Sequence, residues 1–593
     1  MEKFDWFNGW VNNMVFTYVL LDEKASKAQM EKRFPQFMDK YMGEEMKKYG
    51  FHNDLLLLPM KDIYFEPSSE FDAVKHGDKT VVYIFLSIGI LILLIACINF
   101  MNLSTIRAVE RSKEVGLRKV LGALRNHLVR QFIGESILLT AVSCILAVCL
   151  LQLLMPVYNQ LLGYQLTVSW SSPAIYIFLA GIILAVGFLS GSYPAFFLSA
   201  FSPIQALKGK LRLGKGGSLF RQALVVVQFS ISVFLIIGTI VIMSQMNFMK
   251  NKQLGYNKEQ IVVMPLSNSD IYEHLNSFKK ELQSKSNIEA VSMMSGEPGG
   301  YFDMYAYWAE GQSDKEATIL RSEFSDFEFV KMLGLKIIAG RDFSAQYPTD
   351  TTDAVLVNRA AATKLGFTPE QAIGKWIQHS VRDKNKRYII GVIEDFNFLS
   401  LKENIEPLVI APNDERRVAL IKLKAGNIQA GLNAIKEVYS KAAPLYPFEY
   451  FFLDEKFGQL YKKDLRQQTI LSVFAGLAIF IACLGLFGLA SFTAAKRTKE
   501  IGVRKVLGSS TENVVMLLSK DLLKPVIIAT LIAIPVSYTV MNNWLQSFAY
   551  KTTMHWWIFV LAAMITLLIA LITVSIKAVK AAVANPINSL RSE

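Results

Sequence analysis

The sequence has few cysteines and histidines, the residues on which disulfide frameworks and many metal sites depend. Its four cysteines, Cys97, Cys144, Cys149 and Cys483, all lie inside long apolar runs. They form no CxxC pair, so we interpret them as small buried packing residues. The six histidines are scattered without the spacing of metal ligands. These features argue against a disulfide-stapled protein and against a metal enzyme.

Charge is scarce inside the apolar runs and abundant between them. The hydrophobic share of 52% and the mean hydropathy of +0.30 are too high for a soluble protein of 593 residues. The net charge of +13 gathers at the ends of apolar runs, which argues against nucleic-acid binding. A membrane span needs about 20 apolar residues. We predict seven spans, at residues 81–103, 136–157, 174–198, 221–244, 467–491, 523–545 and 556–577.

The loops between the predicted spans differ strongly in basic residues. Segment 104–135 holds seven Lys and Arg, and segment 492–522 holds six. On the opposite side, segment 158–173 has none and segment 546–555 has only Lys551. Basic loops stay in the cytoplasm, so the first pair of segments is predicted to be cytoplasmic. The long polar segments before the first span and between the fourth and fifth spans are then exterior.

A repeated motif divides the chain into two related parts. Residues 111–122 read RSKEVGLRKVLG and residues 497–508 read RTKEIGVRKVLG, with nine of twelve positions identical. The offset between the copies is 502 − 116 = 386 residues. SPIQALK (202–208) and NPINSLR (585–591) close the two units. The pattern predicts two three-span units in parallel orientation, and repeated membrane units are typical of two-halved transporters.

The exterior segment 245–466 is charged, turn-rich and mixed in period. Residues 260–266, 353–357 and 387–393 are predicted strands, and residues 270–285 and 428–441 are predicted amphipathic helices. The fold class is therefore an α-helical membrane protein with about seven spans in two parallel units, plus an exterior α+β domain. The predicted divisions are 1–80, the end of a similar exterior domain with a strand and a helix over 16–34; 81–220, the first unit; 221–244, a linking span; 245–466, the exterior domain; and 467–593, the second unit.

Each basic turn combines a charged face with an apolar one. Leucines recur at helical spacing from Leu117 through Leu124 to Leu128 and predict one apolar face along a helix. Glu114 and Arg118 are spaced as an i, i+4 ion pair, and the second copy repeats this spacing.

The simplest interpretation is that these turns anchor the chain at the membrane interface by contact with lipid headgroups. Anchoring explains the basic residues, but not the same glutamate, glycines and residue order in both copies. We therefore favour a protein-docking role. It is assigned to Arg111, Lys113, Glu114, Gly116, Arg118, Lys119 and Gly122, and to Arg497, Lys499, Glu500, Gly502, Arg504, Lys505 and Gly508.

Two other patterns resemble catalytic motifs without completing them. GKLRLGKG (209–216) has the glycine and lysine spacing of a phosphate-binding loop, but Gly216 stands where a Ser or Thr would hold magnesium. Arg341, Asp342, Glu394 and Asp395 could suggest a hydrolase, yet they are better interpreted as turn and strand-end residues. We expect no catalytic residues, no metal and no cofactor in this chain.

The sequence resembles the MacB/FtsX-type ABC transporter permeases, in the tandem form common in Bacteroidetes. KEVGLRKVLGA (113–123), KEIGVRKVLGS (499–509) and, in the exterior segment, FVKMLGLKIIAGRDFS (329–344) carry the resemblance. Tandem members resemble two copies of a span, a periplasmic domain and three spans. We therefore expect this chain to lack the first span and most of the first periplasmic domain.

The resemblance implies a membrane subunit in the bacterial inner membrane that is not itself an enzyme. Two copies of a cytoplasmic ABC ATPase would bind ATP and Mg²⁺, and each copy would bind one of the two basic turns. A periplasmic adaptor or effector is a further expected partner. The predicted function is export, or extraction from the membrane, of a hydrophobic or amphipathic cargo. The alternative is an FtsX-like regulator that activates a periplasmic partner, such as a cell-wall hydrolase, without transport.

Overall fold

The structure is a computed structural model that divides into two compact units. One unit is helical and contains residues 79–248, 463–547 and 551–593; the other contains residues 1–78, 249–462 and 548–550. The structure describes residues 16–49, 52–66, 76–110, 112–163, 165–199, 215–266, 269–300, 302–312, 317–380, 385–412, 416–496 and 498–583. The two closing motifs at 202–208 and 585–591 and most of GKLRLGKG lie outside these residues.

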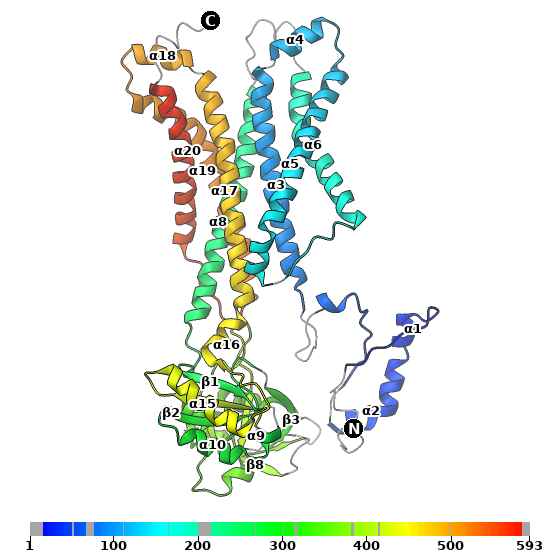
Figure 1. Cartoon of the computed structure of the whole chain (residues 1–593), viewed down its shortest axis with the longest axis vertical. Helices are drawn as coiled ribbons and strands as arrows, with labels where there is room; N and C mark the ends of the chain where they lie inside the picture. The colour runs from blue at the N-terminus through cyan, green and yellow to red at the C-terminus, as the bar shows by residue number, and fades with distance from the viewer. Residues whose placement is uncertain are drawn as a thin grey trace. The chain divides into compact units, whose positions relative to one another are not determined.

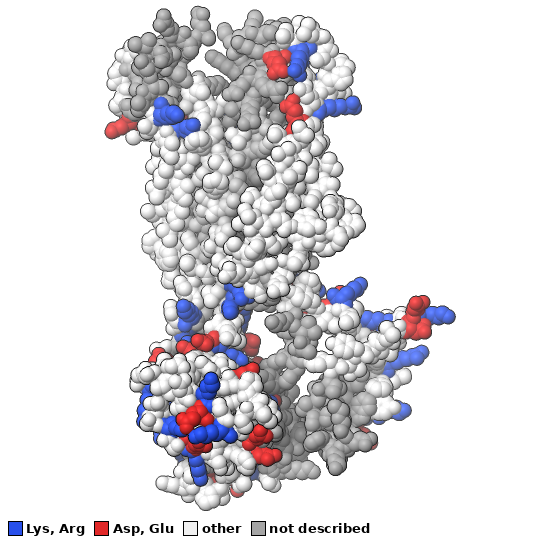
Figure 2. Space-filling view, in the orientation of Figure 1, with Lys and Arg blue, Asp and Glu red and all other residues white. Residues whose placement is uncertain are grey.

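The helical unit is built from long apolar helices joined by short ones (Figure 1). Its helices are α3 (Lys79–Glu110), α4 (Ser112–Val120), α5 (Arg125–Leu162), α6 (Pro173–Ser199), α8 (Lys215–Asn251), α17 (Lys462–Lys496), α18 (Thr498–Val506), α19 (Thr511–Leu545) and α20 (Trp556–Val583). Seven of these are long and apolar enough to cross a membrane, which confirms the predicted spans and the multi-pass membrane class. Figure 2 shows a broad band of this unit without charged side chains on the face in view.

The first long helices of the two repeats meet around α8. Ile95 of α3, Leu235 of α8 and Ala478 of α17 belong to one buried cluster. Close by, Asn99 and Gly485 occupy equivalent positions, because 485 − 99 = 386. A Cβ atom at Gly485 would lie only 2.8 Å from Asn99 Oδ1, so glycine lets α17 approach α3 closely.

The other unit contains the predicted α+β domain. Its strands are β1 (Ile261–Pro265), β2 (Ile288–Met294), β3 (Asp303–Ala309), β4 (Thr318–Ser325), β5 (Ile337–Gly340), β6 (Ala354–Asn358), β7 (Trp376–His379), β8 (Lys386–Ile393), β9 (Leu408–Pro412), β10 (Val418–Leu423) and β11 (Phe451–Phe452). Its helices are α9 (Ser269–Tyr272), α10 (Leu275–Gln283), α11 (Phe329–Leu333), α12 (Asp350–Asp353), α13 (Arg359–Lys364), α14 (Pro369–Ala372), α15 (Ile428–Ala442) and α16 (Leu453–Leu460).

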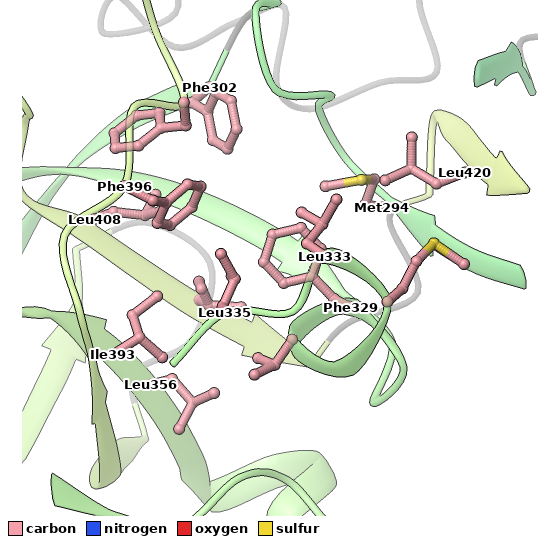
Figure 3. Close-up of a cluster of buried hydrophobic side chains, with 14 of the residues drawn as sticks. Met294, Phe302, Phe329, Leu333, Leu335, Leu356, Ile393, Phe396, Leu408 and Leu420 are labelled. Carbon is pink, nitrogen blue, oxygen red and sulfur yellow. The ribbon is translucent and has the colours of Figure 1, made fainter. Parts of the chain in front are cut away.

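Six strands of the sheet form a closed ring in which each strand pairs with two neighbours. The order β4-β3-β7-β8-β6-β9 is completed by a parallel β4–β9 pairing. Leu320, Val357 and Ile389 lie in the buried cluster of these strands. The strands β11, β1, β10 and β2 continue the sheet beyond β4, and α10 and α15 pack on one of their faces through Phe278 and Ile435. A second cluster, which includes Phe302, Phe329 and Phe396, packs these parts of the sheet together (Figure 3).

Two local expectations are wrong in detail. The predicted helix over 270–285 is broken into α9 and α10 around His274, whose backbone leaves the helical region. Residues 16–22 form no strand, although α1 (Lys27–Glu31) and α2 (Phe34–Tyr49) follow them. A strand needs a hydrogen-bonded neighbour, and none pairs with this segment among the described residues.

Candidate functional site

The two basic turns fold into two short helices of equal length. α4 and α18 have nine residues each and end in the same way. Gly122 has a φ of 95° and Gly508 a φ of 92°, in the left-handed region that favours glycine. The residue after each glycine donates its backbone N–H to the carbonyl of Arg118 or Arg504 at 2.9 Å. This closure is the usual glycine ending of a helix, so both glycines end their helices as predicted.

Each helix carries the predicted internal ion pair. Arg118 Nη2 lies 2.7 Å from Glu114 Oε1, and Arg504 Nη2 lies 2.8 Å from Glu500 Oε1. All four side chains are a little under half exposed. Such exposed pairs contribute only about 0.3–0.5 kcal/mol to helix stability. These ion pairs therefore add little to helix stability, and their main effect is to fix the positions of the charged side chains.

The apolar face of these helices differs from the prediction. α4 ends at Val120, so the leucines from Leu117 to Leu128 do not share one helix. Leu128 is buried on α5, whereas Leu117 and Leu121 are 52% and 78% exposed. The left-handed turn at Gly122 redirects the chain and separates these side chains. Sequence reasoning missed this exposed apolar edge, although the repeated Val-Leu-Gly ending was a signal for it.

Both helices combine a buried apolar side chain with several exposed ones. Val115 of α4 and Ile501 of α18 are buried, and they occupy equivalent positions, because 501 − 115 = 386. Ile501 packs with Val515 of α19 and Ala578 of α20. On the outer side, the exposed apolar side chains are Leu117, Val120 and Leu121 in the first copy and Val503, Val506 and Leu507 in the second.

The structure places the other predicted residues on or beside the same helices. Gly116 is buried, and Lys119 is half-buried. Burial lowers the pKa of Lys119, and the charge of Arg125 lowers it further. Lys113, Lys499, Gly502 and Lys505 lie within the bounds of α4 and α18, whereas Arg111 and Arg497 lie outside the described residues.

One polar contact distinguishes the first copy from the second. Arg118 Nη1 donates to Gln131 Oε1 at 3.0 Å, and Gln131 Nε2 donates to Glu135 Oε1 at 3.0 Å. The residue equivalent to Gln131 is Leu517, which cannot accept this hydrogen bond. α4 is therefore tied to α5 by a polar chain, while α18 is held to its neighbours by apolar packing.

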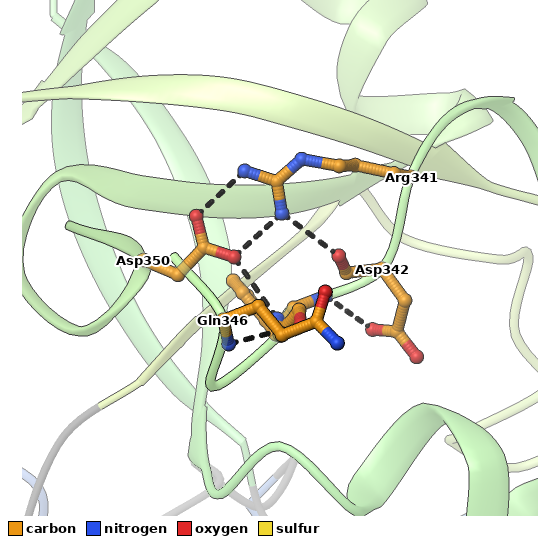
Figure 4. A network of polar contacts seen from close by, with 6 residues as sticks. Arg341, Asp342, Gln346 and Asp350 are labelled. Carbon is orange, nitrogen blue, oxygen red and sulfur yellow. Dashed lines mark hydrogen bonds and ion pairs between the residues drawn. The ribbon is translucent and has the colours of Figure 1, made fainter. Parts of the chain in front are cut away.

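Arg341 and Asp342 of the α+β domain belong to a local network of polar contacts in a loop (Figure 4). Arg341 holds Asp350 through two hydrogen bonds of 2.6 and 2.7 Å, and this contact lowers the pKa of Asp350. Asp342 accepts from the backbone N–H of Phe343, and burial raises its pKa. Asp395 accepts from the backbone of Ala360. These contacts explain the residues as turn-stabilising groups, in agreement with the sequence interpretation.

Comparison with known proteins places these helices in a family. A family model described as the FtsX-like permease C-terminal domain matches residues 86–203 and again residues 472–586. The macrolide export ATP-binding/permease protein MacB of Bdellovibrio bacteriovorus is 32% identical over 136 residues, and the uncharacterized ABC transporter permease YknZ of Bacillus subtilis is 28% identical over 124 residues. These similarities support an ABC permease of the MacB/FtsX type, with an FtsX-like permease segment in each half of the chain.

The two family matches contain α4 and α18 at corresponding places, which confirms the predicted duplication. The aligned stretches cover 23% and 21% of this permease but only 20% of MacB and 30% of YknZ. Among solved structures, the periplasmic region of MacB from Actinobacillus actinomycetemcomitans matches at 12% identity with a TM-score of 0.27, covering 36% of the permease and 97% of that chain.

Proposed function

We propose that the chain binds a cytoplasmic ABC ATPase through α4 and α18 and couples ATP hydrolysis to movement of its helices. The observation that carries the proposal is the same exposed surface in both repeats. Each copy combines an ion-paired arginine with a row of exposed apolar side chains at its helix end. An interface typically joins an apolar centre with a charged edge, and both are present here.

Two similar docking helices suit two copies of one ATPase. The equivalent positions of Val115 and Ile501, and of Gly122 and Gly508, would present each ATPase copy with the same backbone. ATP and Mg²⁺ would bind in the partner. The basic loops beside these helices support a cytoplasmic location for them in the bacterial inner membrane.

The proposed cargo is hydrophobic or amphipathic and is handled on the exterior side. The α+β domain of more than 200 residues supports this role, because a switch for one small partner needs far less surface. The name of the MacB relative describes macrolide export, a property of that protein which agrees with a bulky, largely apolar cargo. An exterior adaptor would accept the cargo.

Charge reversal tests the docking role. We expect the double variant Arg118→Glu/Arg504→Glu to lose co-purification with the ATPase, because it reverses the charge of both proposed contacts. Membrane insertion should remain, since the arginines lie outside the spans. The control is Lys424→Glu, an exposed residue of the α+β domain that lies outside the spans and outside both docking helices.

A charge swap separates docking from helix stability. Glu114→Arg/Arg118→Glu, with Glu500→Arg/Arg504→Glu, keeps an i, i+4 pair on each helix but exchanges its ends. If the partner recognises the position of charge, the swapped chain stays unbound. Binding restored by the swap would mean that only helix stability matters, and the docking role would be wrong.

The cargo assignment needs a separate assay. ATPase activity of the reconstituted complex should rise when an amphipathic peptide or macrolide is added. If activity responds instead only to an exterior protein such as a cell-wall hydrolase, the regulatory alternative is correct and transport is not the function.

A further inference from the structure

Segment 396–402 of the α+β domain, which lies between β8 and β9, contacts the chain next to two long apolar helices. Asn397 donates its backbone N–H to the carbonyl of Leu254 at 2.8 Å, and Leu254 closely follows α8. Leu401 donates its backbone N–H to the hydroxyl of Tyr461 at 2.8 Å, and Tyr461 directly precedes α17. Asn397 is 9% exposed and Leu401 is fully buried, so both contacts are shielded from water.

The same segment contacts the loop between α19 and α20. The carbonyl of Lys402 accepts from the backbone N–H of Ala549 at 3.2 Å. The Lys402 ammonium group lies 5.9 Å from the centre of the buried Phe548 ring, and that of Lys252 lies 4.4 Å from the centre of the Tyr550 ring. The stretch from Phe548 to Tyr550 belongs to the same compact unit as the α+β domain, whereas the residues on either side of it belong to the helical unit.

Two aromatic side chains anchor the segment in the core of the α+β domain. Phe396 and Phe398 are each 1% exposed, and their ring centres lie 5.4 Å apart. The ring of Phe302 lies 4.7 Å from that of Phe398 in the same buried cluster (Figure 3). The carbonyl of Phe398 also accepts from the backbone N–H of Gly299 at 2.7 Å. A close-packed interior has low compressibility and transmits strain, so a shift of this segment also loads the core around it.

These contacts allow two interpretations. Each contact could fix only its own residue, as ordinary packing does. Alternatively, the segment could move as one unit, because the three backbone hydrogen bonds to Leu254, Tyr461 and Ala549 all fall within residues 397–402. Contiguous segments often open cooperatively, and one only six residues long with both ends held favours that behaviour.

We propose that segment 396–402 is a single joint that attaches α8, α17 and the α19–α20 loop to the exterior domain. Displacement at one attachment is then passed to the other two. α8 and α17 continue into this domain along the chain, whereas α19 and α20 are joined to it by the contacts of their loop. The joint is a property of the chain alone, and it rests on the proposed function only for the ATPase that would move it.

Hydrogen exchange of the purified full-length chain tests the joint without the ATPase. Tyr461→Phe removes the hydroxyl that accepts from Leu401, and Phe548→Ala removes the ring near Lys402. Exchange is measured at the amide of Asn397, whose own hydrogen bond neither variant alters. We expect each variant to speed this exchange about tenfold, because loss of one attachment loosens the whole segment. The double variant should give less than the product of the two effects, since coupled contacts are not additive.

Controls separate opening of the joint from general destabilisation. Tyr446→Phe removes an exposed hydroxyl of the same domain and should leave exchange at Asn397 unchanged. Exchange in β6 should stay unchanged in every variant, and Phe548→Leu serves if alanine prevents folding. If Tyr461→Phe and Phe548→Ala leave Asn397 unaffected, or if their effects simply multiply, the contacts are independent and the proposal is wrong.

The ATPase complex tests whether the joint carries movement. A non-hydrolysable ATP analogue should change exchange at Asn397 in the wild-type complex and leave it unchanged in the Tyr461→Phe/Phe548→Ala variant. No change in the wild-type complex, or an equal change in the variant, would overturn this role. A wild-type chain that fails to bind the ATPase would instead overturn the docking proposal, and the exchange results on the chain alone would still decide whether the joint exists.

Discussion

Glu323 on β4 is a fully buried carboxyl group in the α+β domain. Its Oε1 atom accepts hydrogen bonds from the backbone and hydroxyl of Ser295 and from the backbone of Gly296, whereas Oε2 has no partner. Burial raises the pKa of Glu323 well above its ordinary value, although the three hydrogen bonds act in the opposite direction. The folded protein therefore holds a proton on Glu323 at a pH where the unfolded chain has released it.

This proton makes stability depend on pH in a defined direction. Above the unfolded pKa of about 4.3, the folded state binds more protons than the unfolded state, so stability falls as pH rises. We predict that Glu323→Gln, which is neutral at every pH, removes a slope of up to about 1.4 kcal/mol per pH unit. Thermal unfolding of the full chain between about pH 5 and 8 measures this. The two proteins should differ most at high pH; parallel curves would contradict the prediction.

The burial of Glu323 could not be predicted from the local sequence. β4 alternates Leu320, Ser322 and Phe324 with Arg321 and Glu323, a pattern that favours a strand with one wet face. The structure buries both faces, and it pairs β4 with β3 on one edge and with the distant β9 on the other. That parallel pairing joins residues more than 80 positions apart, and no local pattern contains it.

At the scale of elements, the glycine endings of α4 and α18 give the most direct test. No atom lies within 4 Å of a Cβ added at Gly122 or Gly508, so a side chain would cause no clash. The cost of Gly→Ala is then the left-handed backbone alone, about 1–2 kcal/mol at each site. We predict that the double variant Gly122→Ala/Gly508→Ala unwinds the ends of both helices and lowers co-purification with the ATPase.

Asparagine provides the matched control for these glycines, because it enters the left-handed region at lower cost than alanine. Gly122→Asn/Gly508→Asn should therefore retain more ATPase than the alanine variant. Equal binding by both variants would mean that the turn geometry is unimportant for docking. Membrane levels of each variant, measured on the same samples, separate a docking defect from a folding defect.

For α4 and α18, the sequence pattern predicted some features correctly and others not. The repeated residues predicted the ion pairs and the glycine endings, because both depend on contacts within five residues. Whether each leucine is buried depends on where the chain turns and on which residues α5 packs against. Leu121 and Leu128 have the same residue type and helical spacing, yet only Leu128 is buried. Helical periodicity could not separate them.

At the scale of the whole molecule, the two repeats are alike in sequence order but different in packing. Asn99 lies against Gly485 at equivalent positions, and α6 packs closely on α5 at Gly187 and Gly191. Fusion of two halves in one chain allows such differences, because each half can change independently. We infer that the two proposed docking helices are kept similar for two similar partners, while the packing around them has changed.

The proposed assembly requires both docking helices on the same side of the membrane. The test uses a chain with its four native cysteines replaced and single cysteines introduced at Ala123 or Ser509, the equivalent residues after each docking helix. Thr167 and Lys551, which are exposed in the loops poor in basic residues, serve as opposite-side positions. A membrane-impermeant maleimide should label Thr167→Cys and Lys551→Cys in intact cells. It should label Ala123→Cys and Ser509→Cys only after permeabilisation, because basic loops remain in the cytoplasm. Labelling of either docking position in intact cells would show that its helix lies outside the cell. A cytoplasmic ATPase could not bind that helix, and the proposed binding of two ATPase copies would be wrong.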